Sequence, residues 1–245
     1  MGEKLVIYFF HAFPLNSNMW KEQIRYFSPK VRCVAINFPG FGGASDDSIP
    51  QNPSLSDYAK FAEDIILNTS EGVKICIVGL SMGGYIAMEV IKRKVVRPDF
   101  LVLANTKSSP DTQGARQRRF KLIEEIDKLK SVEPVISFYL PNLVPPESFL
   151  KEKVLEMAKT ASLSGLKKAL FAMAERQDYQ KYIDDFPGRL LCIGGEKDVL
   201  SPPDVVKSMA RDKEKEFRLI KGVGHLSNME NPEEFNNILE EFLFS

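Results

Sequence analysis

Ser81 lies in a short motif that is typical of a nucleophilic serine. Residues 79–83 have the pattern Gly-x-Ser-x-Gly. In this pattern a strand turns sharply into a helix, and the two glycines leave room for the crowded backbone. The turn strains the serine backbone and presents its hydroxyl above the sheet, beside the N-terminus of the helix. The spacing predicts that Ser81 attacks a carbonyl carbon, although a glycine-rich turn with an idle serine has the same pattern.

A serine hydroxyl is a weak nucleophile at neutral pH, so it needs a neighbouring base. The chain has two histidines, His11 and His225, and each follows shortly after an apolar run. Loops that follow parallel strands share the carboxyl edge of the sheet, so both histidines are expected at the edge that carries Ser81. A lone histidine is often only a hydrogen-bonded structural residue, so the residue type alone does not choose between them.

A carboxylate is needed to hold the histidine in the correct tautomer. Asp198 and Glu196 both follow an apolar run that ends near residue 194. We favour Asp198 and keep Glu196 as the alternative. Without a catalytic role, either residue would simply be a solvated acid in a loop. The chain order Ser81, Asp198, His225 is the order of α/β-hydrolases and differs from those of chymotrypsin and subtilisin.

Acyl transfer also needs N–H donors for the oxyanion that forms during the reaction. One donor is expected to be the backbone N–H of Met82, directly after Ser81. The second is expected from Phe13, in the loop after the first apolar run, since Pro14 has no N–H. On this interpretation His225 is the base, whereas His11 shapes the loop and is expected to contact the substrate.

Six apolar runs predict the strands that must position these residues. They are nearly continuous in Val, Ile, Leu and Phe, which is typical of strands that are covered on both faces. The runs occupy residues 5–10, 31–36, 74–79, 100–105, 189–194 and 216–220. Helical patterns separate them, at 55–68, 82–92 and 232–244. The alternation predicts an α/β fold with a mostly parallel central sheet and helices on both faces.

The segment 107–186 lacks a convincing strand and carries amphipathic helical patterns and several prolines. We predict that it is a helical cap inserted into a core of residues 1–106 and 187–245; long crossover helices are the plainer alternative. Such a cap would help to enclose an apolar pocket for a small molecule. The predicted pocket residues are Leu80, Leu200 and Leu226 in the core and Phe138 and Leu143 in the cap.

Three arginines, Arg116, Arg118 and Arg119, gather at the start of this segment. They could contact an acidic substrate or a carrier protein. A run of this kind is more often a solvated helix face, so the sequence leaves both interpretations open.

Composition argues against several other classes of function. The 245 residues include 33 Lys+Arg and 33 Asp+Glu, and a net charge of zero gives no long-range attraction to nucleic acid or to an anionic membrane. No apolar run approaches the ~20 residues that span a bilayer, and no secretory signal is evident. Three scattered cysteines favour a reducing compartment, and no cluster of metal ligands occurs. We expect a cytoplasmic monomer or homodimer without cofactor or metal.

These motifs resemble the α/β-hydrolase superfamily, in particular small capped hydrolases related to 3-oxoadipate enol-lactonase and to carboxylesterases. The matching segments are residues 11–20 (HAFPLNSNMW), 37–46 (NFPGFGGASD), 79–84 (GLSMGG), 194–203 (GGEKDVLSPP) and 222–243. The resemblance implies the α/β-hydrolase fold, a Ser81–His225–Asp198 triad and an oxyanion hole at Phe13 and Met82.

Two positions depart from the usual pattern of these proteins. Ala12 stands where relatives usually have glycine, so a positive φ at this position would strain or alter the oxyanion loop. Asn37 stands where many relatives have aspartate, and we expect little functional effect.

The motifs together predict a serine hydrolase that cleaves carboxylic esters or lactones of small molecules through an acyl-enzyme on Ser81. Carbon–carbon bond hydrolases, thioesterases, aminopeptidases and perhydrolases use the same machinery and remain alternatives. A ligand-binding protein with vestigial catalysis is a hypothesis of another class, and it has no need for a complete triad. A dinucleotide-binding domain is excluded because the glycine-rich turn after the first strand is absent.

Overall fold

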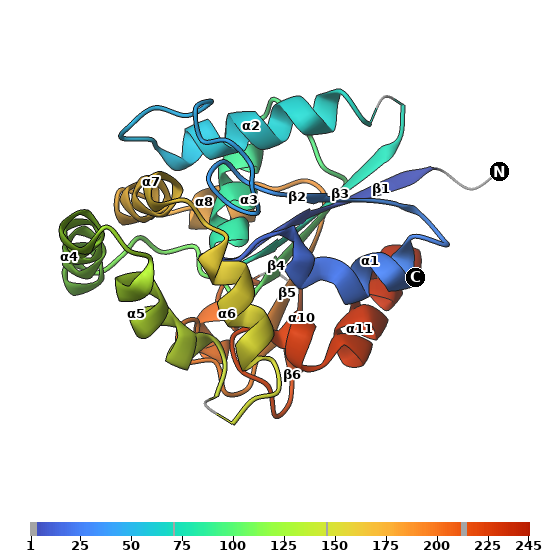
Figure 1. Ribbon diagram of the computed structural model, residues 1–245. Helices are drawn as coiled ribbons and strands as arrows, with labels where there is room; N and C mark the ends of the chain where they lie inside the picture. Colours follow the sequence, from blue (N-terminus) through green and yellow to red (C-terminus); the bar gives the residue numbers. More distant parts are fainter. Residues whose placement is uncertain (1–3, 71, 146, 212–214) are drawn as a thin grey trace.

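A six-stranded parallel sheet forms the centre of the computed structural model, which describes residues 4–70, 72–145, 147–211 and 215–245 (Figure 1). The strand order is β2-β1-β3-β4-β5-β6, and every neighbouring pair is parallel. The strands are β1 (Leu5–Phe10), β2 (Arg32–Ile36), β3 (Lys74–Leu80), β4 (Phe100–Ala104), β5 (Arg189–Gly195) and β6 (Lys215–Ile220). The six predicted runs match these strands to within one residue at each end, which confirms the predicted α/β fold.

Helices cover both faces of the sheet, as Figure 1 shows. One face carries α2 (Leu55–Leu67), α3 (Met82–Arg93), α8 (Gln180–Asp184) and the short α9 (Pro203–Lys207). The other face carries the 3-10 helix η1 (Ser17–Trp20), α1 (Lys21–Phe27), α10 (Ser227–Glu230) and α11 (Pro232–Phe244). Each layer contributes to its own apolar cluster, so the strands are buried on both faces as their sequences predict.

Four helices between β4 and β5 lie beyond the carboxyl edge of the sheet (Figure 1). They are α4 (Gln113–Leu129), α5 (Glu133–Leu143), α6 (Lys151–Lys159) and α7 (Leu163–Ala174). The predicted cap also includes α8, but α8 packs against α3 on the face of the sheet. Just before it, the Tyr179 hydroxyl donates a hydrogen bond of 2.7 Å to Glu89 of α3. We therefore use the word cap for α4–α7 and count α8 among the core helices.

A close backbone approach joins α7 to the loop after β2. Gly40 has a φ of +90°, and a Cβ atom there would lie 2.3 Å from the Cα atom of Gly165 in α7. The Ser162 N–H also donates a hydrogen bond of 2.8 Å to the Gly40 carbonyl. Since neither glycine has space for a side chain, this contact fixes one end of the cap to the core.

Within the described ranges, no helix is both long enough and apolar enough to cross a membrane.

Candidate active site

Ser81 occupies the sharp turn between β3 and α3. Its backbone has φ 55° and ψ −114°, a region that non-glycine residues rarely adopt. The flanking glycines are needed for space, because a Cβ at Gly79 would lie 2.4 Å from the Gly83 carbonyl oxygen. A Cβ at Gly83 would lie 2.1 Å from the carbonyl oxygen of Phe10. The predicted strand–turn–helix context of Ser81 is therefore present.

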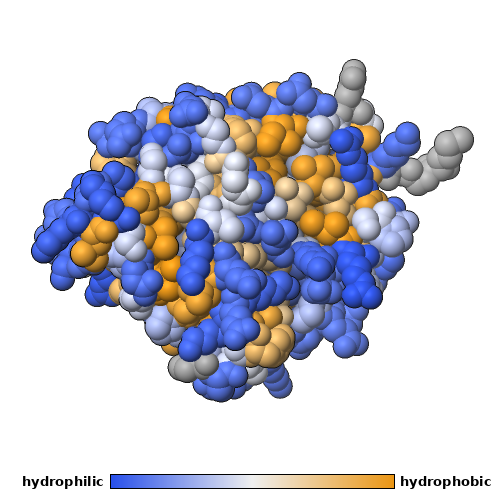
Figure 2. Space-filling view, in the orientation of Figure 1, coloured by the Kyte–Doolittle hydropathy of each residue, from blue (hydrophilic) through white to orange (hydrophobic). Residues whose placement is uncertain are grey.

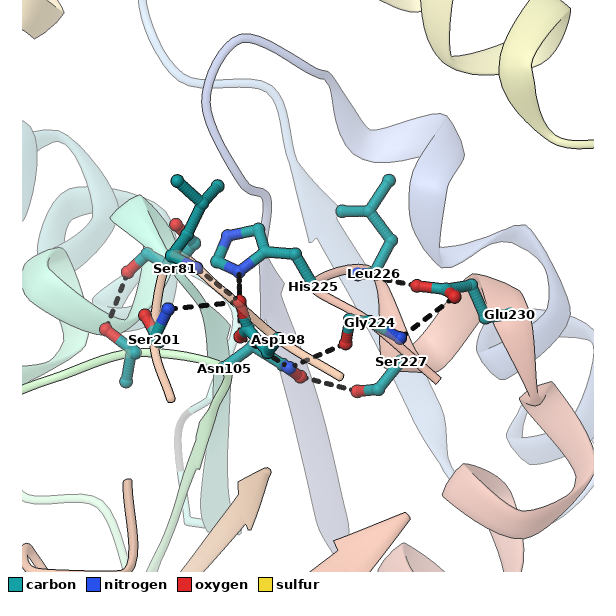
Figure 3. Close-up of polar contacts among 11 residues, drawn as sticks. Ser81, Asn105, Asp198, Ser201, Gly224, His225, Leu226, Ser227 and Glu230 are labelled. Carbon is teal, nitrogen blue, oxygen red and sulfur yellow. Dashed lines mark hydrogen bonds and ion pairs between the residues drawn. The ribbon is translucent and has the colours of Figure 1, made fainter. Parts of the chain in front are cut away.

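A buried hydrogen bond joins His225 to Asp198 beneath Ser81 (Figure 3). The Nδ1 atom of His225 lies 2.9 Å from each carboxylate oxygen of Asp198, and only 2% of His225 and 4% of Asp198 is exposed. Burial alone would raise the pKa of Asp198, but His225 and hydrogen bonds from Asn105 and Ser201 lower it below its usual value. Asp198 therefore stays ionised at neutral pH, and it accepts a hydrogen bond from the Nδ1–H of His225.

The alternative acid, Glu196, takes a different position. Its carboxylate accepts a hydrogen bond of 2.8 Å from the Gly222 N–H, and its side chain is exposed. The structure thus brings Asp198 to the imidazole of His225, and Glu196 caps the neighbouring loop.

The Nε2 atom of His225 faces the same cavity as Ser81. It is buried and has no hydrogen-bond partner among the described residues. Since Nδ1 is committed to Asp198, Nε2 is free to accept a proton from a hydroxyl group. In the close-up the imidazole lies above Asp198, with Ser81 to its left (Figure 3).

Asn105 and Glu230 support this arrangement, and sequence reasoning missed both. Asn105 follows β4 directly, and its amide donates to Asp198 (3.0 Å) and to the Gly224 carbonyl (3.1 Å). Glu230 accepts hydrogen bonds from the N–H groups of Gly224 and Leu226, on either side of His225. The signal for Asn105 was its place after an apolar run, at the same sheet edge as Ser81; we find no such signal for Glu230.

The two predicted oxyanion donors lie at chain positions that leave their N–H groups free. Met82 is the first residue of α3, where the N–H has no intrahelical acceptor. Phe13 lies in the loop after β1, and its N–H makes no hydrogen bond within the described part of the chain. Ala12 is not among the residues with positive φ, so the anticipated strain at this position is absent.

Asn37, the second departure, has a structural role. Its amide oxygen accepts a hydrogen bond of 2.7 Å from the Ser17 N–H, and its NH₂ group donates to the Gly42 carbonyl at 3.3 Å. It thus ties the loop after β2 to the start of η1.

His11 is fully buried behind the oxyanion loop and does not line the cavity. Its Nε2 accepts a hydrogen bond from the Phe38 N–H at 3.1 Å, so Nδ1 carries the proton and lies 3.0 Å from the Ala12 carbonyl. Burial lowers its pKa to about 4, so the ring is neutral at pH 7. The expectation that His11 shapes the loop agrees with this geometry, whereas the expected contact with substrate does not.

The buried state of His11 predicts a pH-dependent stability. Unfolded His11 binds a proton below its ordinary pKa of 6.5, whereas folded His11 resists protonation down to about pH 4. The contribution of His11 to the free energy of unfolding is therefore complete above pH 6.5 and is lost as the pH falls toward 4. Between pH 7 and pH 5 the free energy of unfolding should fall by about 2 kcal/mol from this group. Urea unfolding at both pH values should show this loss, and His11→Gln should reduce it. An equal loss in both proteins would contradict the assignment.

A cavity of about 140 Å³ lies between the carboxyl edge of the sheet and the cap. It is lined by Phe13, Ser81, Tyr85, Lys107, Asp111, Ala115, Arg118, Arg119, Phe138, Tyr139, Met173, Leu200, Ser201 and His225. The predicted wall residues Leu200 and Phe138 are among them. Ser81, His225 and side chains of both the core and the cap therefore line the same partly open cavity, which is the kind of site that binds a small molecule.

Three other predicted wall residues lie in the apolar core instead. Leu80 and Leu226 are fully buried, and Leu143 is 2% exposed in a cluster with other apolar side chains. The prediction for Leu80 was wrong because successive side chains of a strand point to opposite faces. Leu226 and Leu143 likewise pack in the apolar cluster and are not among the residues that line the cavity.

The arginine cluster of the cap divides between the cavity and the outer surface. Arg119 and Arg118 line the cavity, whereas Arg116 pairs with Glu175 on the outside. The visible surface of α4 is largely hydrophilic in Figure 2. One helix thus carries both a solvated face and residues that line the cavity.

No group of three His, Cys, Asp or Glu side chains in the described ranges is placed to hold a metal ion.

Comparison with known proteins places the chain in a family. The model of the alpha/beta hydrolase family matches residues 7–238. A pimeloyl-acyl-carrier protein methyl ester esterase of Legionella pneumophila (strain Corby) is 26% identical, but the match covers 44% of this chain and only 40% of that protein. The (E)-2-((N-methylformamido)methylene)succinate hydrolase of Acinetobacter baylyi is 24% identical over 99% of this chain and 90% of its own length.

Solved structures agree with the fold. A thermophilic esterase from Thermogutta terrifontis, with malate bound, superposes with a TM-score of 0.90 at 27% identity and covers 99% of this chain and 90% of that one. The enol-lactonase from Burkholderia xenovorans LB400 has a TM-score of 0.85 at 17% identity, with coverage of 100% and 93%. The predicted fold and resemblance are thereby confirmed.

Proposed function

The chain belongs to the alpha/beta hydrolase family, and from this premise we propose that it is a serine hydrolase of small carboxylic esters or lactones. The observation that carries the proposal is the geometry around His225. Its Nδ1 atom is hydrogen-bonded to the buried Asp198. Its Nε2 atom has no hydrogen-bond partner among the described residues, and His225 lines the same cavity as Ser81. This is the arrangement that a serine nucleophile needs.

The proposed reaction has two halves. Ser81 Oγ attacks the ester carbonyl while His225 Nε2 takes its proton, and the N–H groups of Met82 and Phe13 stabilise the oxyanion. The C–O bond to the alcohol then breaks, and the alcohol leaves with the proton from His225. A water molecule attacks the acyl-enzyme by the same steps and releases the acid. Asp198 keeps Nδ1 protonated and stabilises the imidazolium in both halves.

The names of relatives support hydrolysis of esters more than the alternatives. Two of the similar proteins are esterases and one is a hydrolase of a substituted succinate. Carbon–carbon bond cleavage or thioester hydrolysis by the same residues is the second candidate, to be tested if simple esters fail.

The cavity volume predicts a preference for short acyl groups. A space of about 140 Å³ accommodates a few carbon atoms beside Ser81, and a longer chain would have to extend out through the open side of the cavity, where it gains fewer contacts. In a series of 4-nitrophenyl esters, we expect kcat/KM to be highest for acetyl and butyryl esters and to fall steeply toward decanoyl. The measurement is initial rate against chain length, with Ser81→Ala as the control. A folded protein that is silent with every ester would contradict the esterase proposal, and enol-lactones would be tested next.

A further inference from the structure

The side chains that line the cavity carry more positive than negative charge. Arg118, Arg119 and Lys107 line it, and Asp111 is the one carboxylate among the lining residues that the structure describes. Behind them, Arg176 is buried with its side chain 0% exposed. A cavity this small with a surplus of cations strongly favours an anionic occupant.

The carboxylate of Asp111 is fully used by two arginines. Its Oδ2 atom accepts from Arg119 Nε at 2.6 Å, and its Oδ1 atom accepts from Arg176 Nη1 at 2.6 Å. Burial alone would raise the pKa of Asp111, but the two guanidinium groups lower it, so the group is ionised. The buried trio still has one uncompensated positive charge, since one carboxylate faces two arginines.

Arg118 and Lys107 add two further charges without a carboxylate partner in the described ranges. Arg118 stacks over the Phe138 ring at 5.2 Å from its centroid, and this stacking holds it at the cavity wall. Lys107 is half-buried and follows Thr106, whose hydroxyl donates to the Ser81 carbonyl at 2.9 Å. Both cations therefore lie on the wall of the cavity that Ser81 also lines, and neither charged group is used in an ion pair with a described residue.

We propose that Arg118, Lys107 and the exposed edge of Arg119 form a subsite for a carboxylate carried by the substrate, opposite Ser81. The substrate class would then be esters or lactones of small dicarboxylic acids, cleaved at one end and held by the other. Guanidinium and ammonium groups bind carboxylates through charge-assisted hydrogen bonds, which are strongest where water is excluded. This inference rests on the proposed hydrolase function.

A pair of nearly isosteric esters tests the subsite. Methyl hydrogen succinate and methyl levulinate differ only in that a carboxylate oxygen replaces a methyl group at the far end. Proton release gives kcat/KM for each ester. We expect the succinate to be preferred by about tenfold or more, because one charge-assisted hydrogen bond is worth that ratio. Arg118→Gln and Lys107→Gln should each lower the ratio toward one. Arg116→Gln, on the same helix but outside the cavity, should leave the ratio unchanged.

Binding to Ser81→Ala separates failure of the subsite from failure of the hydrolase. Calorimetry with methyl hydrogen succinate should show binding that weakens on Arg118→Gln, and inorganic phosphate at equal ionic strength should bind less well. Hydrolysis of both esters at equal kcat/KM would overturn the subsite and leave the esterase intact. Binding without hydrolysis by the wild type would overturn the esterase and keep the anion site. No binding of the succinate, or a preference for phosphate, would overturn the carboxylate assignment.

Discussion

Ser81→Ala should lower kcat/KM for a short ester by about 10³-fold or more, because it removes the atom that forms the acyl-enzyme. The fold should survive, since the hydrogen bonds found at Ser81 use its backbone N–H and carbonyl rather than its hydroxyl. The measurement is kcat/KM together with the melting temperature of both proteins.

Ser201→Ala gives the matched control for this prediction. Ser201 lines the same cavity and holds Asp198 through its backbone N–H, which alanine retains. Removal of the Ser201 hydroxyl should therefore lower kcat/KM by less than about tenfold, since no covalent step depends on it. Comparable losses for Ser81→Ala and Ser201→Ala would contradict the assignment of Ser81 as nucleophile.

Asp198→Asn should lower kcat by an amount on the order of 10³–10⁴ while the protein stays folded. The asparagine keeps the size of the side chain but removes the charge that stabilises the imidazolium. Its NH₂ group can also turn toward Nδ1 and favour the wrong tautomer of His225. The measurement is kcat at neutral pH, with circular dichroism to establish folding.

Glu196→Gln is the control that the chain itself offers. Glu196 lies two residues away, follows the same strand and binds the Gly222 N–H instead of His225. We expect kcat to change by less than about threefold, as for an exposed residue outside the reacting groups. A large loss of kcat in Glu196→Gln together with a small loss in Asp198→Asn would show that Glu196, and not Asp198, is the acid of the triad.

The elements that position the site could be predicted from the sequence because their signals are local. The strands are continuous apolar runs, and the turn at Ser81 needs glycine on both sides for reasons of space. The chain order of the serine, aspartate and histidine then places all three at one sheet edge. Each of these arguments needs only spacing and residue type.

The residues that line the cavity were harder to predict from the sequence, because lining depends on the direction in which a side chain points. Leu80 and Leu226 are sequence neighbours of Ser81 and His225, yet both point into the core. Likewise, the cluster at 116–119 looks uniform in sequence, but helical rotation of ~100° per residue puts Arg118, which lines the cavity, nearly opposite Arg116, which pairs with Glu175 on the outside.

The sequence of α5 does not predict a helix, for a related reason. It contains Pro134 in its first turn and Pro141 in its interior, and proline usually signals the end of a helix. Packing of Val135, Ile136 and Leu143 against the core and cap outweighs that local preference. Tertiary burial of this kind cannot be seen in a single sequence.

Covalent labelling is the direct test of Ser81 as an activated nucleophile. The wild-type protein would be incubated with a 4-nitrophenyl alkylphosphonate, which phosphonylates an activated serine and stays attached, and analysed by intact-mass and peptide mass spectrometry. The account predicts a single adduct on Ser81 that is absent in Ser81→Ala and forms much more slowly in Asp198→Asn. A folded wild-type protein that takes up no label, or takes it up on a residue other than Ser81, would contradict the account.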